Sequence, residues 1–172
     1  MTNIPLDLYR ACKASAWGKN TSQRQKNFIQ QEGTGSLHPE YEGFERGDGT
    51  FRAPDVTTFK DTNDVIWIRG VNDRNQSNNP YVSWKEGTSL SGTPGCFGYG
   101  GWFYFLLPKD TPIPASLDVK HTPSRRDPNH YSLRCINSMT KTAYEGALNT
   151  LARAALAKAV EDKRASLKFS SI

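Results

Sequence analysis

The sequence predicts a single α+β domain, and three observations support this fold class. Short apolar or alternating segments that are typical of β-strands are spread over the whole chain. Long connections rich in glycine, proline and polar residues separate these segments. One helical pattern closes the sequence. A length of 172 residues suits one domain, spanning residues 1–172, that can bury a hydrophobic core.

Six segments have the residue pattern of β-strands. Residues 17–50 are polar without a sustained period, so irregular structure is expected there, with one short helix around 21–31. Residues 51–59 contain an Ala-Pro step that favours extended backbone, and residues 72–80 are expected to form a polar turn. The predicted strands are 6–12, 64–70, 81–84, 101–107, 116–121 and 130–136.

The C-terminal segment is predicted to be one amphipathic helix from Tyr144 onward, because its apolar residues recur at helical spacing. Thr142 and Glu145 match a capping box, with Ser138 and Thr140 as alternative caps. The apolar face is mostly alanine, which favours docking on the domain core over membrane binding. The residues of the predicted apolar stripe are Leu148, Leu151, Ala155, Leu156, Ala159 and Val160.

Composition and charge restrict the function classes. The formal net charge of +5 permits an anionic ligand, but the basic residues are scattered, so a nucleic-acid partner is permitted and not favoured. No signal-peptide layout and no apolar segment of membrane-spanning length occurs, so we expect a protein that acts in the cytosol, without a membrane partner. The three cysteines form no pair and the three histidines have no metal-ligand spacing, so no metal site is expected.

Standard catalytic and nucleotide-binding motifs are absent from the sequence. No P-loop, nucleophile elbow or zinc-protease pattern occurs. Gly98 and Gly100 begin a GxGxxG pattern, but Phe103 stands at the position of the third glycine and no helix follows. Any active site is therefore assembled from segments that lie far apart in the sequence.

Arg10, with Tyr9 beside it in the first predicted strand, is one candidate site residue. A guanidinium group can hold a phosphate or a ribose-linked anion through paired hydrogen bonds. Taken by themselves, the residues favour the alternative, which is a surface salt bridge. His130, which opens the last predicted strand, is another candidate, and a purely structural histidine is its alternative.

The stretch Gly87-Thr88-Ser89 is the third candidate. A glycine lets a ligand approach the backbone closely, and the two hydroxyl groups can bind a sugar or a phosphate. An ordinary hairpin turn explains the same composition at least as well.

Seven short sequence words follow one another in an order that resembles a known family. The words are Leu8-Tyr9-Arg10, Leu37-His38-Pro39, Arg52-Ala53-Pro54-Asp55, Gly87-Thr88-Ser89-Leu90, Thr111-Pro112-Ile113-Pro114, Leu117-Asp118-Val119-Lys120 and His130-Tyr131-Ser132. Each word is weak, but the ordered set spans nearly the whole chain and is fairly specific. The chain is similar to the small type VI secretion toxins with an ADP-ribosyltransferase fold, which have bacterial and fungal members. Residues 92–102 have no clear counterpart in that family.

The resemblance implies split small sheets, mixed or antiparallel, that form a cleft for NAD. It implies that Arg10 contacts the nicotinamide ribose and the phosphates and that Tyr9 lines the pocket. Thr88 and Ser89 match the hydroxyl motif that supports the cleft and the ribose. Gly87 would then be required because the dinucleotide lies close to the backbone.

The third catalytic position departs from the family pattern. No glutamate lies between Glu86 and Glu145, and His130 precedes the last strand in its place. A carboxylate there stabilises the positive charge of the ribose as nicotinamide leaves, whereas a protonated histidine opposes it. Asp127 is the only carboxylate in the preceding turn. The resemblance therefore implies Arg10, Thr88, Ser89 and His130 as the catalytic set.

The implied function is that of a toxin that uses NAD in the cytosol of a target cell. It either transfers ADP-ribose to a macromolecular target or cleaves NAD, and the cell that makes it needs a neutralising immunity protein. Two alternatives stay open. One is an RNA-directed transferase on a related fold, which the positive charge and the missing glutamate favour. The other is a catalytically inactive toxin that occludes a partner.

Overall fold

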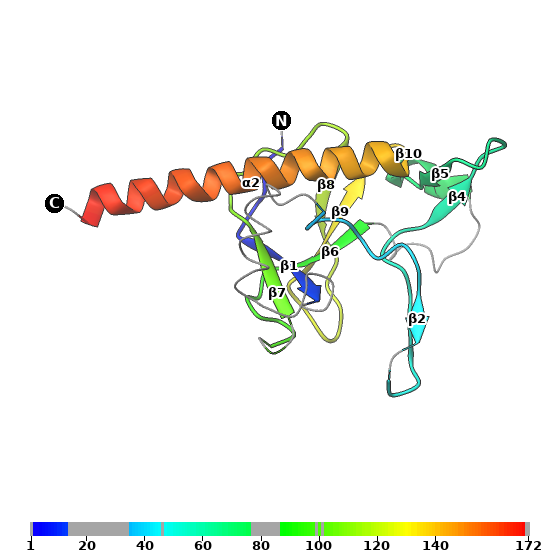
Figure 1. Cartoon of the computed structure of the whole chain (residues 1–172), viewed down its shortest axis with the longest axis horizontal. Helices are drawn as coiled ribbons and strands as arrows, with labels where there is room; N and C mark the ends of the chain where they lie inside the picture. Colours follow the sequence, from blue (N-terminus) through cyan, green and yellow to red (C-terminus); the bar gives the residue numbers. More distant parts are fainter. Residues whose placement is uncertain are drawn as a thin grey trace.

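The computed structural model describes residues 2–13, 35–45, 47–76, 87–98, 100 and 102–170. Within these residues lie a five-stranded sheet of order β7-β1-β6-β9-β8, a three-stranded sheet of order β10-β5-β4 and a hairpin of β2 and β3 (Figure 1). The strand pairings are antiparallel. Together with the long C-terminal helix α2, they confirm the predicted α+β class.

The large sheet consists of β1 (Leu8–Lys13), β6 (Gly87–Ser91), β7 (Trp102–Leu107), β8 (Leu117–His121) and β9 (His130–Cys135). The smaller sheet consists of β4 (Thr58–Lys60), β5 (Ile66–Ile68) and β10 (Met139–Thr140). The hairpin consists of β2 (Phe44–Glu45) and β3 (Phe51–Arg52). A 3-10 helix, η2, spans Val71–Gln76, and α2 spans Lys141–Ser170.

Most predicted strands of the large sheet are confirmed, with boundaries that differ by one or two residues. The strand predicted at 64–70 is shorter than expected. The cause is a turn in which Asp61 Oδ1 accepts hydrogen bonds from the main-chain N–H groups of Asn63 and Val65, at 2.8 and 3.1 Å. These bonds keep the start of the predicted strand out of the β-ladder.

Two polar segments differ from their predicted form. The turn predicted at 72–80 begins as η2. The stretch Gly87-Thr88-Ser89 is part of the central strand β6, so the hairpin-turn alternative is wrong. The helix predicted around 21–31 and the strand predicted at 81–84 lie outside the described residues.

Helix α2 begins at Lys141, and its N-cap is Thr140. The Thr140 hydroxyl accepts a hydrogen bond from the N–H of Ala143 at 3.1 Å, which satisfies one of the unpaired donors of the first turn. The predicted capping box of Thr142 and Glu145 is therefore wrong. No helix among the described residues has the length and apolar character needed to cross a membrane.

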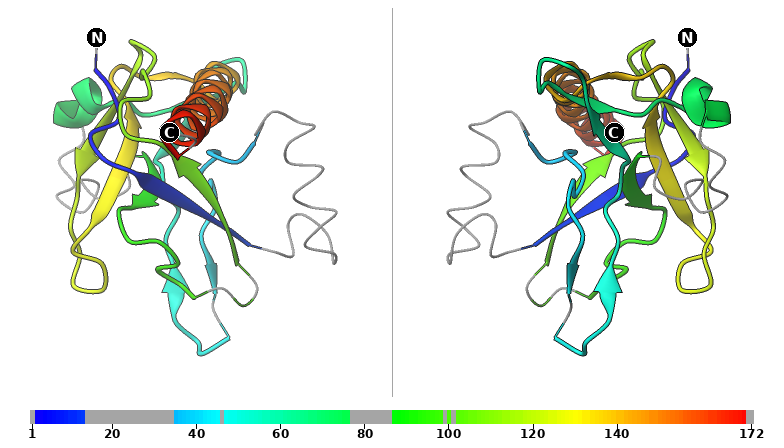
Figure 2. Two further views of the ribbon diagram at one scale, coloured as in Figure 1. Left: turned by 90° about the vertical axis from the view of Figure 1, so that its left-hand side faces the viewer. Right: turned by 90° about the vertical axis from the view of Figure 1, so that its right-hand side faces the viewer.

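One face of α2 packs on the domain and closes the core. Its buried residues are Tyr144, Leu148, Leu151, Ala152 and Ala155. The Tyr144 hydroxyl donates a hydrogen bond to the main-chain oxygen of Leu133 in β9 at 3.0 Å, so the helix is also tied to the sheet by a polar contact. Figure 2 views α2 nearly end-on, above the strands.

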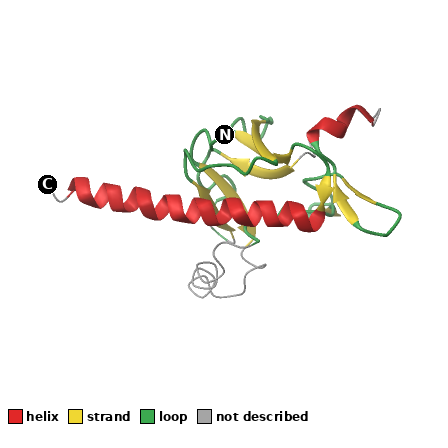
Figure 3. Ribbon diagram, turned by 90° about the horizontal axis from the view of Figure 1, so that it is seen from above, coloured by secondary structure: helices red, strands yellow, loops and turns green. Residues whose placement is uncertain are grey.

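The apolar stripe of α2 is buried over only part of its predicted length. Ala155 is fully buried, whereas Val160 is 51% exposed. The reason is geometric, because the helix continues beyond the edge of the sheets (Figure 3). The prediction of a stripe that is buried as far as Val160 is therefore wrong at its C-terminal end.

The large sheet is divided between β1 and β6. Strand β1 pairs with β7 along its whole length, and β6 pairs with β9 along its whole length. Between β1 and β6 the register contains a single pair, Tyr9 with Ser91. The two halves, β7-β1 and β6-β9-β8, therefore part beyond this pair, which agrees with the split sheet that the family resemblance implies.

Gly87 is required by the packing of β6 on β9. Its φ is not positive, so no left-handed backbone explains the glycine. A Cβ atom on Gly87 would instead lie 1.8 Å from the main-chain oxygen of Leu133. The close approach that the sequence predicted to be to a ligand is made here by the neighbouring strand.

Replacing Gly87 with alanine is expected to lower the free energy of unfolding by about 2 kcal/mol or more, because β6 and β9 must move apart. Urea unfolding followed by circular dichroism measures the change. Gly100→Ala is the matched control, since a Cβ there would meet nothing within 4 Å and its φ is not positive. Equal stability of the two variants would contradict the close packing at Gly87.

Candidate functional site

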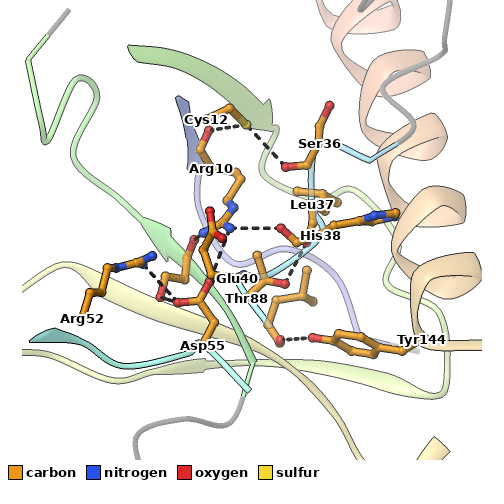
Figure 4. Close-up of polar contacts among 12 residues, drawn as sticks. Arg10, Cys12, Ser36, Leu37, His38, Glu40, Arg52, Asp55, Thr88 and Tyr144 are labelled. Atoms are coloured by element: carbon orange, nitrogen blue, oxygen red, sulfur yellow. Dashed lines mark hydrogen bonds and ion pairs between the residues drawn. The ribbon is translucent and has the colours of Figure 1, made fainter. Parts of the chain in front are cut away.

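Asp55 is a buried carboxylate where the two halves of the large sheet part, and four donors converge on it (Figure 4). Its side chain is 4% exposed. Oδ1 accepts hydrogen bonds from the Ser89 hydroxyl at 3.1 Å and from Nη2 of Arg52 at 3.2 Å. Oδ2 accepts from the main-chain N–H of Glu40 at 2.9 Å and from Nη2 of Arg10 at 3.4 Å. One carboxylate thus joins β1, β3, β6 and the segment before β2.

Arg10 spans the opening between the halves. Nη1 donates to the main-chain oxygen of Ser89 at 3.1 Å, and Nη2 donates to the main-chain oxygen of His38 at 3.0 Å. With Asp55, these contacts leave the Arg10 side chain only 9% exposed. The surface salt bridge considered for Arg10 is therefore wrong in its location, since the ion pair is buried.

Thr88 fixes the segment around Leu37 and His38, which carries the main-chain oxygen that Arg10 contacts. Its hydroxyl donates to the main-chain oxygen of Leu37 at 2.7 Å, and the residue is fully buried. On the other side of the segment, His38 Nδ1 lies 2.9 Å from a Glu145 oxygen and Nε2 lies 3.0 Å from Asn149 Oδ1. The segment is therefore fixed between β6 and α2. The Thr88 hydroxyl serves this internal contact.

His130 pairs with Ser91, the residue of β6 that also forms the single register pair between the two halves of the large sheet. Ser91 of β6 is the register partner of Tyr9 on one side and of His130 on the other. Ser91 and Ser89 share one face of β6 and lie about 7 Å apart, because side chains alternate along a strand. His130 Nδ1 lies 2.8 Å from the Thr122 hydroxyl, which can donate to it, and 2.9 Å from the main-chain oxygen of Thr122, which can accept from it.

The structure thus brings together only some of the predicted residues. Arg10 and Ser89 meet directly and share Asp55. His130 and Tyr9 are the register partners of Ser91, which lies two residues from Ser89 on β6. Gly87 and Thr88 belong to the same strand, with Gly87 against β9 and the Thr88 hydroxyl against Leu37.

Sequence reasoning missed Asp55 and Arg52 as members of the site. Both occur in one of the words that carry the family resemblance, where no role was predicted for them. The available signal was a pair of opposite charges three residues apart, with Pro54 between them to hold the backbone extended. The Arg10 contact was not visible, because it joins residues 45 positions apart.

The charges at this site suit an anionic substrate. Two guanidinium groups contact the single carboxylate of Asp55, so the three groups together carry one net positive charge. The Arg52 side chain is 28% exposed, so it is partly accessible from solvent. A planar guanidinium matches the oxygens of a phosphate group, so Arg52 can contact an anion that approaches from solvent.

Two buried thiols, Cys12 and Cys135, lie on strands β1 and β9 of the large sheet. Burial raises the pKa of Cys12, on β1 two residues from Arg10, to about 11. Burial likewise raises the pKa of Cys135, at the end of β9, to about 12. Both thiols are therefore protonated near neutral pH, and neither is suited to act as a nucleophile. Cys96 is partly exposed.

Removing the charge of Asp55 is expected to destabilise the fold. Asp55→Asn leaves Arg10 and Arg52 without their carboxylate, and breaking a buried pair typically lowers the free energy of unfolding by about 3–5 kcal/mol. Urea unfolding measures the loss. Asp162→Asn is the control, because Asp162 forms an exposed pair with Lys158 on α2, and no measurable loss is expected there. An Asp55→Asn protein as stable as the parent would refute the central role of this carboxylate.

Thiol labelling tests the burial around the site. In the folded protein at neutral pH, a disulfide reagent such as dithionitrobenzoate is expected to react fastest with Cys96, because burial raises the pKa of all three thiols and Cys96 alone among them is partly exposed. Absorbance at fixed time points counts the reacting thiols. The Cys96→Ser protein should show no fast reaction, and a fast reaction of a second thiol in the parent would contradict the described packing.

The chain matches a known family over most of its length. The family model described as Tse2 ADP-ribosyltransferase toxin matches residues 6–160, which extend from β1 into α2 and include all the site residues named above. No curated protein matches the chain. Because the matched residues make up most of the sequence, the chain belongs to the Tse2 ADP-ribosyltransferase toxin family.

Proposed function

We propose that the chain, as one domain over residues 1–172, binds NAD where the two halves of the large sheet part. It then transfers ADP-ribose to a macromolecular target or releases it to water. The observation that supports this proposal is the meeting of Arg10 from β1 and Ser89 from β6 at one buried carboxylate, Asp55. Family membership supports the reaction class.

Arg10 and Arg52 supply the positive charge for the diphosphate of NAD. Ser89, held by Asp55, positions the nicotinamide ribose through its hydroxyl group, and Tyr9 lines the pocket beside it. Asp55 acts through Arg10 and Ser89 and is a positioning residue. Gly87 and Thr88 keep β6, β9 and the segment around Leu37 in place, and so shape the site from behind.

In the reaction, the bond between C1′ of the ribose and the nicotinamide nitrogen breaks, and nicotinamide leaves with the bonding electrons. An oxygen of the target or of water forms the new bond to C1′, and its proton passes to a base. We assign this role to Nε2 of His130, because Thr122 occupies Nδ1 through both its hydroxyl and its main-chain oxygen, and the tautomer protonated on Nδ1 carries its lone pair on Nε2. A neutral His130 adds no positive charge against the developing charge of the ribose.

The biological setting follows from the same proposal. The protein acts as a toxin in the cytosol of a target cell, and the cell that makes it holds a neutralising protein. A catalytically inactive toxin that occludes a partner is the competing function, and it predicts no turnover of NAD.

Incubation of the pure protein and a cell lysate with NAD labelled in its adenine tests the proposal. Transfer requires that label enter macromolecules while nicotinamide is released in equal amount. Release of nicotinamide without macromolecular label identifies NAD cleavage. Neither product, together with no NAD binding by calorimetry, overturns the proposal and leaves the inactive toxin.

Substitution of Arg10 separates geometry from charge. Arg10→Lys keeps the charge but loses the planar group that spans Ser89, His38 and Asp55. We expect kcat/KM for NAD to fall by about 100-fold, as for a misplaced substrate. Ser89→Ala should also reduce kcat/KM, and it should lower the melting temperature moderately, because the buried carboxylate of Asp55 loses one of its donors.

Arg153→Lys on the exposed face of α2 is the matched control and should retain full activity. Melting temperatures of all variants show whether lost activity reflects unfolding. Full activity of a folded Arg10→Lys protein would exclude a positioning role for the Arg10 guanidinium.

A further inference from the structure

Two turns at the end of the large sheet farthest from α2 form a surface that the proposed site leaves unused (Figure 2). The first turn, residues 92–98, follows β6, and the second turn, residues 122–129, joins β8 to β9. They lie side by side, because Gly92 N–H donates to the main-chain oxygen of Asn129 at 2.9 Å and Asn129 Nδ2 donates to Thr93 Oγ1 at 3.0 Å. The first turn follows Ser91 and the second precedes His130, so both adjoin the register pair of these two residues, which lies next to the pair of Ser89 and Ser132.

The second turn is basic and exposed. Arg125 and Arg126 are both exposed, and neither forms an ion pair with any residue that the structure describes. Asp127 is the one acid of this turn, and its Oδ1 accepts the N–H of Asn129 at 3.0 Å. Lys120, near the end of β8, adds a further exposed positive charge. Two adjacent guanidinium groups of this kind suit consecutive phosphates.

The first turn presents an aromatic ring to solvent. Phe97 is 61% exposed and stacks on Trp102, with ring centroids 4.8 Å apart and planes 26° from parallel. Tyr104 fixes the turn, since its hydroxyl accepts the N–H of Phe97 at 3.0 Å and donates to the main-chain oxygen of Gly98. The Phe97 ring is therefore exposed to solvent, while its main chain is fixed by Tyr104 and Trp102 stacks against it.

We propose that the surface made by Phe97, Arg125 and Arg126 binds a single-stranded polynucleotide, with the arginines on phosphates and an unpaired base stacked on the Phe97 ring. Exposed arginines and an exposed aromatic ring on adjoining turns are the combination that single-strand-binding proteins use. A duplex keeps its bases stacked on one another, so it cannot use the ring.

The position of this surface gives the bound strand a role, which rests on the proposed function. Because the two turns adjoin Ser91 and His130, a strand bound there lies next to the proposed NAD site. One of its oxygen atoms can then serve as the acceptor, forming the bond to C1′ as nicotinamide leaves and giving its proton to His130 Nε2. The net positive charge of the chain favours the approach of such a strand.

Fluorescence anisotropy with labelled oligouridylate, oligothymidylate and duplex RNA, measured without NAD over a series of salt concentrations, tests the binding. Both single strands should bind more tightly than the duplex. Arg125→Gln/Arg126→Gln should flatten the slope of log K against log salt by about 1.4, which corresponds to two phosphates at about 0.7 each. Phe97→Leu keeps apolar bulk without the ring and should weaken binding about fivefold or more.

Arg153→Gln/Lys163→Gln, which removes two exposed charges from α2, is the matched control and should leave the salt slope unchanged. Equal binding of duplex and single strand, an equal loss in the control, or no binding at all overturns the proposal. Binding of polyglutamate but not of oligonucleotides overturns it in favour of an acidic protein.

Nicotinamide release from NAD in the absence of nucleic acid distinguishes this proposal from the proposed function. The Arg125→Gln/Arg126→Gln protein should retain any such release, because the two arginines have no assigned contact with NAD. Loss of polynucleotide binding with NAD cleavage intact supports the separate surface. Loss of both in a protein that melts at the same temperature as the parent would contradict it.

Discussion

The buried carboxylate of Asp55 is the interaction on which the geometry of the site depends. It accepts hydrogen bonds from β1, β3, β6 and the segment before β2, which are distant from one another in the sequence except for β3 and that segment. Because the sheet halves share one register pair, the ladder alone leaves their separation weakly determined. The Arg10–Asp55 pair sets that separation from inside the opening, and a buried ion pair with several hydrogen bonds tolerates little displacement.

The fold was largely predictable because its signals are local. Alternation marks the strands of the large sheet, and helical spacing marks α2 as far as Ala155. The late start of the strand predicted at 64–70 came from local hydrogen bonds of Asp61 that pattern alone does not reveal, whereas the cap at Thr140 was among the alternatives that the sequence offered. Where the burial of α2 ends was not predictable either, because it depends on how far the sheets extend beneath the helix.

The site was less predictable because it depends on contacts between distant segments. Arg10 and Ser89 were identified through a family resemblance, and they do meet. Asp55 was missed, since nothing in its immediate sequence indicates that an arginine 45 residues away would contact it. Thr88 illustrates the opposite error. Its hydroxyl group suggested a ligand contact, but alternation along β6 turns it toward Leu37 in the interior.

The placement of β1 in the large sheet has a consequence for how the protein comes into being. This strand precedes the other described strands in the chain, yet its partners are β6 and β7, and the pair Tyr9–Ser91 spans almost half of the sequence. Contacts so distant in sequence form late and make folding slow. In a chain that is still being synthesised, the strand that carries Arg10 does not have both of its partner strands until β7 has left the ribosome. The site around Arg10 is therefore assembled only after more than half of the chain has been made, so a nascent toxin chain lacks this site for more than half of its synthesis.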